Sequence, residues 1–535
     1  MDEADIVVVG GGSGGSAVAG RLSEDRSLSI ALLEAGGRNA GLKIVVPGLF
    51  AIPNPVSNWA YETVPQPGLN GRRGYQPRGK GLGGSSAINA MAYIRGNAWD
   101  YDNWAARHGC PGWAWDDVLP WFRRSEANSR GADHFHGGDG PLTVSDLKHP
   151  HAGTRDFIAA AESLQIPHNP DFNGARQDGV GLYQVTQRNG ERWSAARAYL
   201  DAAKDRANLH VLTEANADRI LFDEGRAWGV AYVRDGEAKV IRARKAVVLA
   251  AGVFGTPQLL MLSGIGPGKQ LREFGLPVRL DRPAVGDNLQ DHIDYVAAFE
   301  TRGSYFMGKT LVHAFKTVGA LARWFARRDG PMTTNYAEAG GFLRVMPRES
   351  DGTDIPDVQL HFVPAPLEDH GRGDTKGAGF SCHVCVLRPE SKGTVRLASL
   401  DPRAAPLIDP GFLTDDRDLA VLKAGVRAMY RIMESAPLNT HAGRDRNPID
   451  LADDDALERL IRARADTVYH PVGTARMGSD PAAVCDPRLR VRGVEGLYVA
   501  DASIMPRLVS GNTNAPSIMI GERCAAFVAE DLAGR

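Results

Sequence analysis

A glycine-rich turn near the N-terminus has the residue types and spacing needed to hold a phosphate group. Gly10, Gly12 and Gly15 form a G-x-G-x-x-G pattern directly after the β-branched run Ile6-Val-Val-Val9. The first glycine permits a tight turn, the second lets backbone amides approach a pyrophosphate, and the third lets a helix pack closely on a strand. Ser13 lies where that helix is expected to begin, and helix N-termini favour anions. The pattern therefore predicts a dinucleotide site.

A carboxylate stands at the matching distance from this turn. Glu34 follows Gly15 by 19 residues and ends a second strand-like run over residues 28–33. In a β-α-β unit an acid at this place accepts hydrogen bonds from both ribose hydroxyls and repels a 2′-phosphate, which disfavours NADP. A glycine-rich turn alone can be an ordinary turn, and the unit does not separate FAD from NAD.

Two further residues could move a proton and stabilise a negative oxygen. His470 precedes Pro471, which favours an extended backbone, and an imidazole pKa of about 6.5 suits a general base. Asn512 lies in the turn Gly511-Asn-Thr-Asn514, and its amide could donate a hydrogen bond to a developing oxyanion. Taken alone, a histidine is more often structural and an asparagine more often a turn former.

Other reactive side chains form weaker patterns. His134-Phe-His136 and His149-Pro-His151 have the spacing of metal ligands but lie in loops without a carboxylate or thiolate set, so no metal site is predicted. Cys382 and Cys385 lie in an alternating, strand-like run that sends the two thiols to opposite faces. For His292 we expect a structural role at a domain junction.

The elements that position these residues belong to a large globular protein. The 535 residues are too many for one ordinary domain, and 43% hydrophobic residues can bury a large core. With 62 Lys and Arg against 64 Asp and Glu, no basic field exists to attract nucleic acid. Five scattered cysteines, no signal-peptide pattern and no apolar run of about 18–20 residues predict a cytoplasmic location.

Motifs along almost the whole chain together resemble the glucose–methanol–choline (GMC) family of flavin oxidoreductases. The likeness includes one departure, since Val253 stands where the family usually has a small residue. Within the family it is strongest to bacterial choline-dehydrogenase-like alcohol dehydrogenases, including quinone-linked enzymes of alkane degraders. The general motifs are Gly79-Lys-Gly-Leu-Gly-Gly-Ser-Ser-Ala-Ile-Asn89, Thr256-Pro-Gln-Leu-Leu-Met-Leu-Ser-Gly-Ile-Gly266, Asn288-Leu-Gln-Asp-His292, His470-Pro-Val-Gly-Thr474 and Val499-Ala-Asp-Ala-Ser503, and the finer likeness lies in residues 171–174, 181–187 and 387–397.

The resemblance implies an α/β protein with a Rossmann-like FAD-binding domain and a second domain built on an antiparallel sheet with helices. Because the motifs are scattered, the FAD-binding domain is expected to be discontinuous, over residues 1–150, 193–300 and 467–535, with the substrate domain over residues 151–192 and 301–466. Some relatives attach FAD covalently through a histidine directly before the asparagine of the first motif. Ile88 occupies that position here, which implies noncovalent FAD.

The resemblance also assigns cofactor contacts by position. The ADP half is expected at Gly10, Gly12, Gly15 and Glu34, the pyrophosphate and the isoalloxazine edge at Arg78, Gly83, Gly84 and Asn89, and adenine at the backbone of Ala217. The ribityl chain is expected near Asp501 and Ala502, and the flavin pyrimidine near Thr513, while Tyr469 is either a flavin neighbour or a packing residue.

The implied reaction is oxidation of a primary alcohol to an aldehyde. His470 would be the base and Asn512 the alkoxide donor, hydride would pass to flavin N5, and a quinone or another acceptor would take the electrons. The alternatives are an oxidase that uses O2 on aromatic or furanic alcohols and, more remotely, an FAD-containing hydroxynitrile lyase. No cage for a trimethylammonium group is recognisable, so a neutral alcohol is favoured over choline. The oligomeric state is not predicted.

One segment without acidic residues has the pattern of a basic amphipathic helix. At 100° per residue Lys309, Lys316, Arg323 and Arg327 share one stripe within residues 309–328. The opposite face carries Leu311, Phe315, Val318, Ala322 and Phe325. This apolar face either packs into the core of the substrate domain or contacts a membrane with anionic lipid near the substrate entrance, which would place the protein on the inner face of that membrane.

Overall fold

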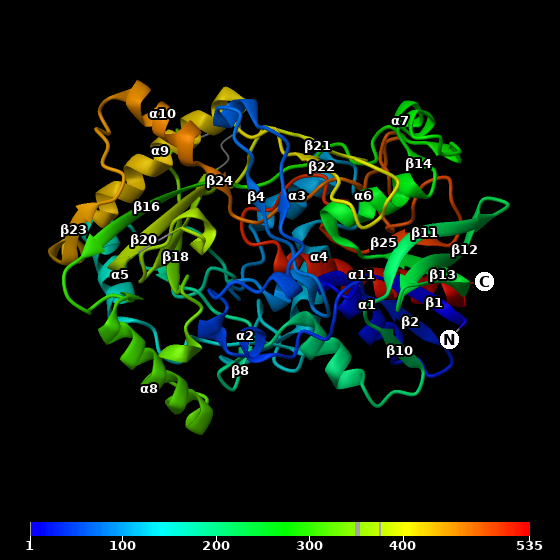
Figure 1. Cartoon of the computed structure of the whole chain (residues 1–535), viewed down its shortest axis with the longest axis horizontal. Coiled ribbons are helices and arrows are strands. Elements are labelled where there is room, and N and C mark those ends of the chain that lie inside the picture. The colour runs from blue at the N-terminus through cyan, green and yellow to red at the C-terminus, as the bar shows by residue number, and fades with distance from the viewer. Residues whose placement is uncertain (1, 348–353, 374–375, 535) are drawn as a thin grey trace.

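Two sheets organise the chain, which a computed structural model describes over residues 2–347, 354–373 and 376–534. The first sheet lies at the right of Figure 1 and the second at the left, each with its own helices. The mixed α/β fold expected from the sequence is confirmed, with a parallel-rich sheet and an antiparallel one.

The first sheet contains the β-α-β unit predicted at the N-terminus. Its strands run in the order β10-β2-β1-β13-β12-β11, with β25 also paired to β13. Strands β1, β2 and β25 are buried on both faces, which explains their continuous apolar sequences. The parallel strands are β1 (Glu3–Val9), β2 (Ile30–Leu33), β10 (Leu209–Leu212), β13 (Glu237–Leu249) and β25 (Leu497–Val499), and β11 (Asn216–Asp223) and β12 (Arg226–Arg234) are antiparallel.

Two helices begin at the C-terminal edge of these strands and pack on each other. α1 (Ser13–Leu22) follows β1, and α11 (Asn514–Ala533) follows β25. Ligands of parallel α/β sheets bind at this edge, where helix N-termini point outward. The other helices of this region are α2 (Leu42–Val45), α3 (Ala98–Arg107), α4 (Trp115–Ser125), α6 (Gly252–Leu262) and α7 (Gly268–Glu273).

The second sheet is antiparallel, in the order β23-β16-β20-β19-β18-β7. α5 and α9 cover one of its faces, where alternate side chains of β19 and β20 form a core with them. The other alternate residues, among them Gln359, His361 and His383, therefore lie on the opposite face. The elements are β7 (Gly179–Leu182), β16 (Ile293–Thr301), β18 (Ala339–Leu343), β19 (Val358–Val363), β20 (Gly377–Val386), β23 (Ala442–Asp445), α5 (Ala152–Ser163), α8 (Leu311–Arg327), α9 (Asp416–Met433) and α10 (Asp454–Arg464).

Short strand pairs complete the fold. Cys382 packs in the core under α9 while Cys385 does not, as expected for two thiols on opposite faces, and all five cysteines are free and buried. No helix in the described part of the chain has the length and apolarity to cross a membrane. The short strands are β3 (Tyr61–Glu62), β4 (Tyr75–Gln76), β5 (Glu126–Asn128), β6 (Leu142–Val144), β8 (Gln187–Arg188), β9 (Glu191–Arg192), β14 (Ile265–Gly266), β15 (Leu280–Asp281), β17 (Gly308–Lys309), β21 (Thr394–Arg396), β22 (Leu407–Asp409) and β24 (Asp466–Thr467).

Two segments lie on the other side of the domain boundaries expected from the sequence. β16 pairs with β20 in the antiparallel sheet, although residues up to 300 were assigned to the first domain. The β21–β22 hairpin packs Val395 and Ile408 into the core of the first sheet, although residues 301–466 were assigned to the second. In both cases hydrogen bonds and apolar contacts with residues distant in the sequence determine the domain in which the segment lies. The sequence motifs carry no information about these contacts.

The predicted basic amphipathic helix is α8, but its apolar face is not in the core. His313, Ala320 and Trp324 are buried, whereas Phe315 and Val318 are exposed. The interpretation that placed the apolar face in the core of the substrate domain is therefore wrong. A narrower stripe, with an indole and an imidazole in it, forms the packing face instead.

Candidate active site

A cavity of about 990 Å³ is lined both by the C-terminal edge of the first sheet and by the free face of the second. Most of the residues singled out from the sequence line it. Gly15 and Gly83 do not. Those that do are Gly10, Gly12, Ser13, Glu34, Arg78, Gly84, Asn89, Ala217, Tyr469, His470, Asp501, Ala502, Asn512 and Thr513.

The three glycines of the first motif have different surroundings. Gly10 has φ +103°, and a Cβ atom there would lie 2.3 Å from the Ala250 carbonyl oxygen. A Cβ atom on Gly15 would lie 1.9 Å from the Gly10 carbonyl oxygen, so this position needs glycine for packing. No atom lies within 4 Å of a Cβ built on Gly12, which borders the cavity. Gly12 thus leaves its backbone open to a ligand.

Glu34 is buried at one end of the cavity and is held by backbone amides. Its carboxylate accepts hydrogen bonds from the amides of Gly11 at 2.7 Å and of Gly36 and Gly81 at 2.9 Å. A carboxylate offers about four lone-pair sites, so one remains for a hydroxyl group. This position suits a sugar hydroxyl.

The middle of the cavity suits an anion. Ser13 and Thr513 lie at the N-termini of α1 and α11, so two helix dipoles present positive ends to the same space. Asp501 accepts hydrogen bonds from the Gly252 amide at 2.9 Å and the Thr256 hydroxyl at 2.6 Å, and burial raises its pKa. The space between the two helix ends suits a pyrophosphate, and polar groups lie on either side of that space. This arrangement is the one that a dinucleotide requires.

Gly83 lies where the two glycine-rich loops contact each other, and it does not face the cavity. Its amide donates to the Gly11 carbonyl at 2.7 Å, and its φ of +90° lies in the region that glycine favours. A Cβ atom at Gly84 would lie 2.8 Å from the Cα of Gly12, so the loops approach too closely for a side chain. Both glycines therefore keep the two glycine-rich loops in close contact beside the cavity.

His470 lies at the other end of the cavity, and its tautomer is determined by a second histidine. The Nδ1 atoms of His470 and His292 are 3.0 Å apart, and His292 Nε2 lies 3.1 Å from the Leu387 carbonyl oxygen. A carbonyl only accepts, so His292 carries its proton on Nε2 and accepts on Nδ1. His470 must then donate from Nδ1, which leaves the lone pair on Nε2.

Asn512 meets that lone pair. Its Nδ2 donates to His470 Nε2 at 3.1 Å, and its Oδ1 accepts from Gln359 Nε2 at 3.1 Å. The second contact fixes which end of the amide faces His470. A proton acceptor and a hydrogen-bond donor therefore meet in the cavity, and a hydroxyl group that displaced their mutual hydrogen bond could contact both.

Burial keeps His470 neutral. It lowers the pKa of the imidazole well below 6.5, and His292, His361 and Arg78 lower it further. The backbone amide of His470 donates to Asp291 at 2.9 Å, and burial raises the pKa of that carboxyl to about 6. An unprotonated imidazole can accept a proton.

The residue before His470 has a strained backbone. Tyr469 has φ +75°, which is uncommon for an aromatic residue. Arg78 Nη2 donates to the Tyr469 carbonyl at 2.8 Å, and the Tyr469 hydroxyl lies 2.7 Å from His370 Nδ1. These contacts hold the turn that brings His470 to the cavity, and they place Arg78 beside Tyr469 and His470.

Three polar residues at this end were not recognised as functional from the sequence. His292 was expected to be structural, but it is the hydrogen-bond partner of His470. Gln359 orients Asn512, and His361 lines the cavity beside Asn512 with no hydrogen bond to its ring nitrogens from the described residues. The strand Val358-Gln-Leu-His-Phe-Val363 alternates apolar residues with the polar residues Gln359 and His361. This alternation is the feature of the sequence that could have revealed these two residues.

Comparison with known proteins gives the family of the chain. Models of the family described as GMC oxidoreductase match residues 4–294 and 389–521. The chain belongs to this family. The GMC resemblance inferred from the motifs is thus confirmed, and with it an FAD-dependent enzyme that oxidises an alcohol-type substrate.

Relatives cover nearly the full length of the chain. The sequence is 43% identical over 530 residues to "Alcohol dehydrogenase [acceptor]" of Pseudomonas putida, covering 98% of this chain and 95% of that protein. It is 41% identical to the oxygen-dependent choline dehydrogenase of Burkholderia multivorans, covering 98% and 93%. The crystal structure of pyridoxine 4-oxidase from "Mesorbium loti" is similar with a TM-score of 0.88 and 31% identity, covering 98% of each chain.

Proposed function

We propose that this GMC oxidoreductase oxidises a neutral primary alcohol to an aldehyde, with His470 as the general base and Asn512 as the donor to the forming alkoxide. One observation carries the proposal: the His470 Nε2 lone pair and the Asn512 amide meet at 3.1 Å in the cavity. FAD would be held by Glu34 and by the N-termini of α1 and α11, and when bound it would supply the hydride acceptor.

The neighbours of His470 suit it to proton transfer. When Nε2 takes the hydroxyl proton, the imidazole becomes positive, and its Nδ1 proton stays hydrogen-bonded to His292. His292 is backed by the Leu387 carbonyl, whose partial negative charge stabilises the positive imidazole through the chain. Asn512, whose Oδ1 is held by Gln359, would donate an amide hydrogen to the substrate oxygen once the substrate displaces its bond to His470.

The charges around the cavity favour a neutral substrate. Among the described residues that line it, the carboxylates are Glu34 and Asp501, both at the nucleotide end. The substrate end is lined largely by apolar residues, including Met91, Phe306, Met332 and Val363. A trimethylammonium group would find no carboxylate there, so an aliphatic or benzylic alcohol fits better than choline.

The same surroundings support noncovalent FAD. Ile88, at the position where some family members carry the attaching histidine, lines the cavity directly before Asn89 and has no nucleophilic atom. Denaturation in acid should release all the yellow colour into the filtrate. Flavin that stays with the precipitated protein would contradict noncovalent binding.

The electron acceptor is the second part of the proposal. We favour a quinone or similar acceptor, because the Pseudomonas putida relative is named an acceptor-linked alcohol dehydrogenase. An oxidase that uses O2 is the alternative, since the Burkholderia relative is named oxygen-dependent and the similar structure is an oxidase.

Anaerobic stopped-flow reduction of the purified flavoprotein by a panel of alcohols tests both parts. Bleaching by primary alcohols, stable in air and reversed by a soluble quinone, is the expected result. Rapid reoxidation with peroxide release would replace the dehydrogenase by an oxidase. Failure of every alcohol to bleach the flavin would remove the proposed reaction and favour a hydroxynitrile lyase.

A further inference from the structure

α8 presents a continuous apolar stripe to solvent. Leu311 is 82% exposed, Phe315 80% and Val318 69%, and they lie at helical spacings of three and four residues. Phe325 extends the stripe by two further turns and is 50% exposed. Scattered exposed apolar residues are normal, whereas such residues gathered on one helix face indicate an interaction surface.

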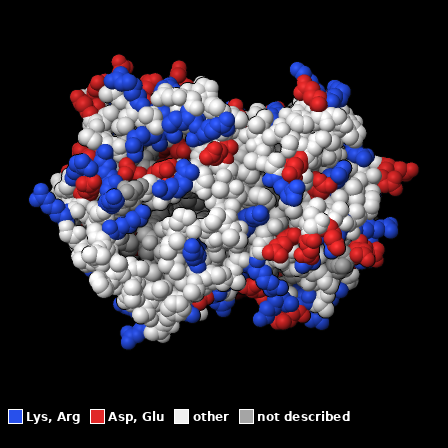
Figure 2. Space-filling view, viewed as in Figure 1, with Lys and Arg blue, Asp and Glu red and all other residues white. Residues whose placement is uncertain are grey.

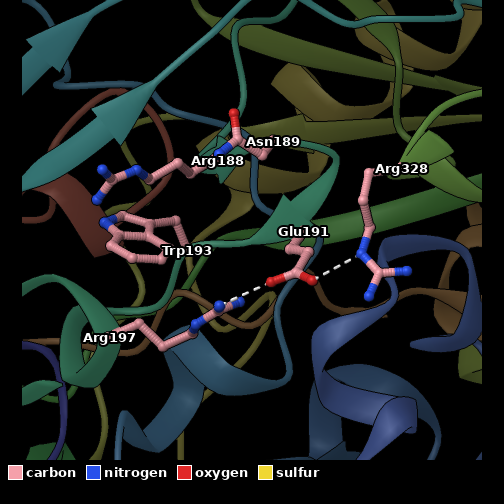
Figure 3. Close-up of a pocket in the computed structure, with 6 residues that line it drawn as sticks. All are labelled: Arg188, Asn189, Glu191, Trp193, Arg197 and Arg328. Atoms are coloured by element: carbon pink, nitrogen blue, oxygen red, sulfur yellow. Dashed lines mark hydrogen bonds and ion pairs between the residues drawn. The ribbon is translucent and has the colours of Figure 1, made fainter. Parts of the chain in front are cut away.

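Specific contacts hold α8 in this orientation. On the packed face, the Trp324 indole donates to the Gly190 carbonyl at 2.7 Å. At the C-terminal end, Arg328 donates to Glu191 at 3.0 Å, and Glu191 also accepts from Arg197 at 2.7 Å, as Figure 3 shows. Turning the apolar stripe inward would break these bonds, so the outward orientation belongs to the folded state.

A second segment adjoins the helix and is also apolar. Val46 and Leu49 pack with Ala320, Trp324 and Met332 beneath α8. The segment 42–56 exposes three large apolar side chains to solvent. They are Leu42, Ile52 and Val56. We call these three residues, together with Leu311, Phe315, Val318 and Phe325, the apolar rim.

The two segments that carry the apolar rim have charges of one sign only, and Asp329, just beyond α8, pairs with Arg323 at 2.6 Å. Residues 35–61 and 302–328 contain no Asp or Glu, and they include the exposed cations Lys43, Lys309 and Arg327. Lys43 and Lys316 donate only to uncharged oxygens in the bonds recorded for them, at Pro53 and Ser304 respectively. The surface over α8, at the lower left of Figure 2, is mainly uncharged with blue atoms.

The apolar rim borders the place where the cavity reaches solvent. Ile52 and Pro53 from one segment and Lys309, Lys316 and Thr317 from the other are all exposed and line the cavity. A ligand that travels from this opening to His470 would enter between the two segments.

We propose that the apolar rim docks on a bilayer containing anionic lipid and seats the opening of the cavity at its surface. Apolar side chains would enter the interfacial layer while the cations contact lipid phosphates. The docking itself is independent of the reaction. The inference that apolar alcohols and a quinone enter from the lipid rests on the proposed function.

Charge favours a bilayer over a second copy of the chain as the occupant. A two-fold dimer would place this cationic surface against itself, and like charges across an interface disfavour association. An anionic lipid surface is complementary to both properties of the rim, its apolar residues and its positive charge.

Vesicle flotation of the full-length FAD-loaded protein tests the proposal. The protein should float with vesicles of phosphatidylcholine and phosphatidylglycerol, bind phosphatidylcholine alone more weakly, and be released by salt. The double variant F315S/V318S should bind at least about tenfold more weakly, and R327E about fivefold. The control V240S removes a comparably exposed apolar side chain from β13, in the other sheet, and should bind as the wild type does.

Each outcome has a definite meaning. All variants should reduce their flavin normally with a water-soluble alcohol, because none of these residues lines the cavity. Wild-type protein that does not float, or F315S/V318S that floats normally, would overturn the docking surface. Self-association lost in F315S/V318S without vesicle binding would assign the rim to a dimer. Floating protein that no alcohol reduces would leave the docking intact and refute the proposed reaction.

Discussion

The two ends of the cavity are built in different ways. At the nucleotide end, backbone amides and glycines do most of the work: Glu34 is held by three main-chain N–H groups, and Gly10 and Gly15 are required by contacts with carbonyl oxygens. At the catalytic end, side chains hold side chains, in the order Gln359, Asn512, His470 and His292. At the first end residues 10–34 are consecutive along the chain, although Ala250 and Thr513 complete it, whereas the second end depends wholly on segments up to 220 residues apart.

This difference predicts that binding and chemistry can be separated. Changes at the nucleotide end should lower flavin content and leave the rate of the loaded molecules unchanged. Changes at the catalytic end should lower the rate and leave flavin content unchanged.

The largest effect on rate is expected from His470→Ala. Without the base, flavin reduction by a primary alcohol should slow by about 10²–10⁴-fold. Flavin content should stay near that of the wild type, since Glu34 and the helix N-termini are untouched. Stopped-flow absorbance gives the rate and the flavin-to-protein ratio gives the content. Near-normal reduction would show that another group removes the proton.

The reverse pattern is expected from Gly12→Val. The new side chain would project into the open space beside Gly12 and displace the pyrophosphate, so FAD should bind about 10²-fold more weakly, the value of two or three hydrogen bonds. Gly37→Val is the matched control, because a Cβ there is also unobstructed but Gly37 does not line the cavity. Titration of apoprotein with FAD measures affinity. Equal losses of FAD affinity in both variants would argue against the pyrophosphate site assigned beside Gly12.

The same contrast explains how much the sequence could predict. The β-α-β unit, its glycines and Glu34 follow from local rules, because strand, turn and helix are consecutive. His470 and Asn512 were placed through the family resemblance. The partnership of His292 with His470 could not be derived, because it depends on the approach of two segments 178 residues apart. The sequence left open whether the apolar face of α8 points into the core or outward, since periodicity gives a helix two faces but does not say which is packed.

A smaller effect is expected at His292, which positions the base without touching the substrate. His292→Leu leaves the His470 Nδ1 proton unpaired, a cost of about 1–3 kcal/mol, so kcat should fall about 10- to 100-fold with little change in flavin content. His292→Asn keeps an acceptor near the Nδ1 position and should recover part of this loss. If both variants lost the same activity, the tautomer argument would fail.

The smallest effect is expected from a change of pH. No titrating group belongs to both the nucleotide end and the catalytic end of the cavity. The pKa of His470 is held well below 6.5, and a base works only when unprotonated, so kcat/KM should be constant from pH 8 down to about 7. A decline centred near pH 6 would come from Asp291, whose pKa burial raises to about 6 and which accepts a hydrogen bond from the His470 amide. Asp291→Asn should remove that decline and leave the later one caused by His470. A decline centred on pH 6.5 or above, unchanged by Asp291→Asn, would mean that His470 titrates like an exposed imidazole, and the buried arrangement of the catalytic end would lose its proposed role.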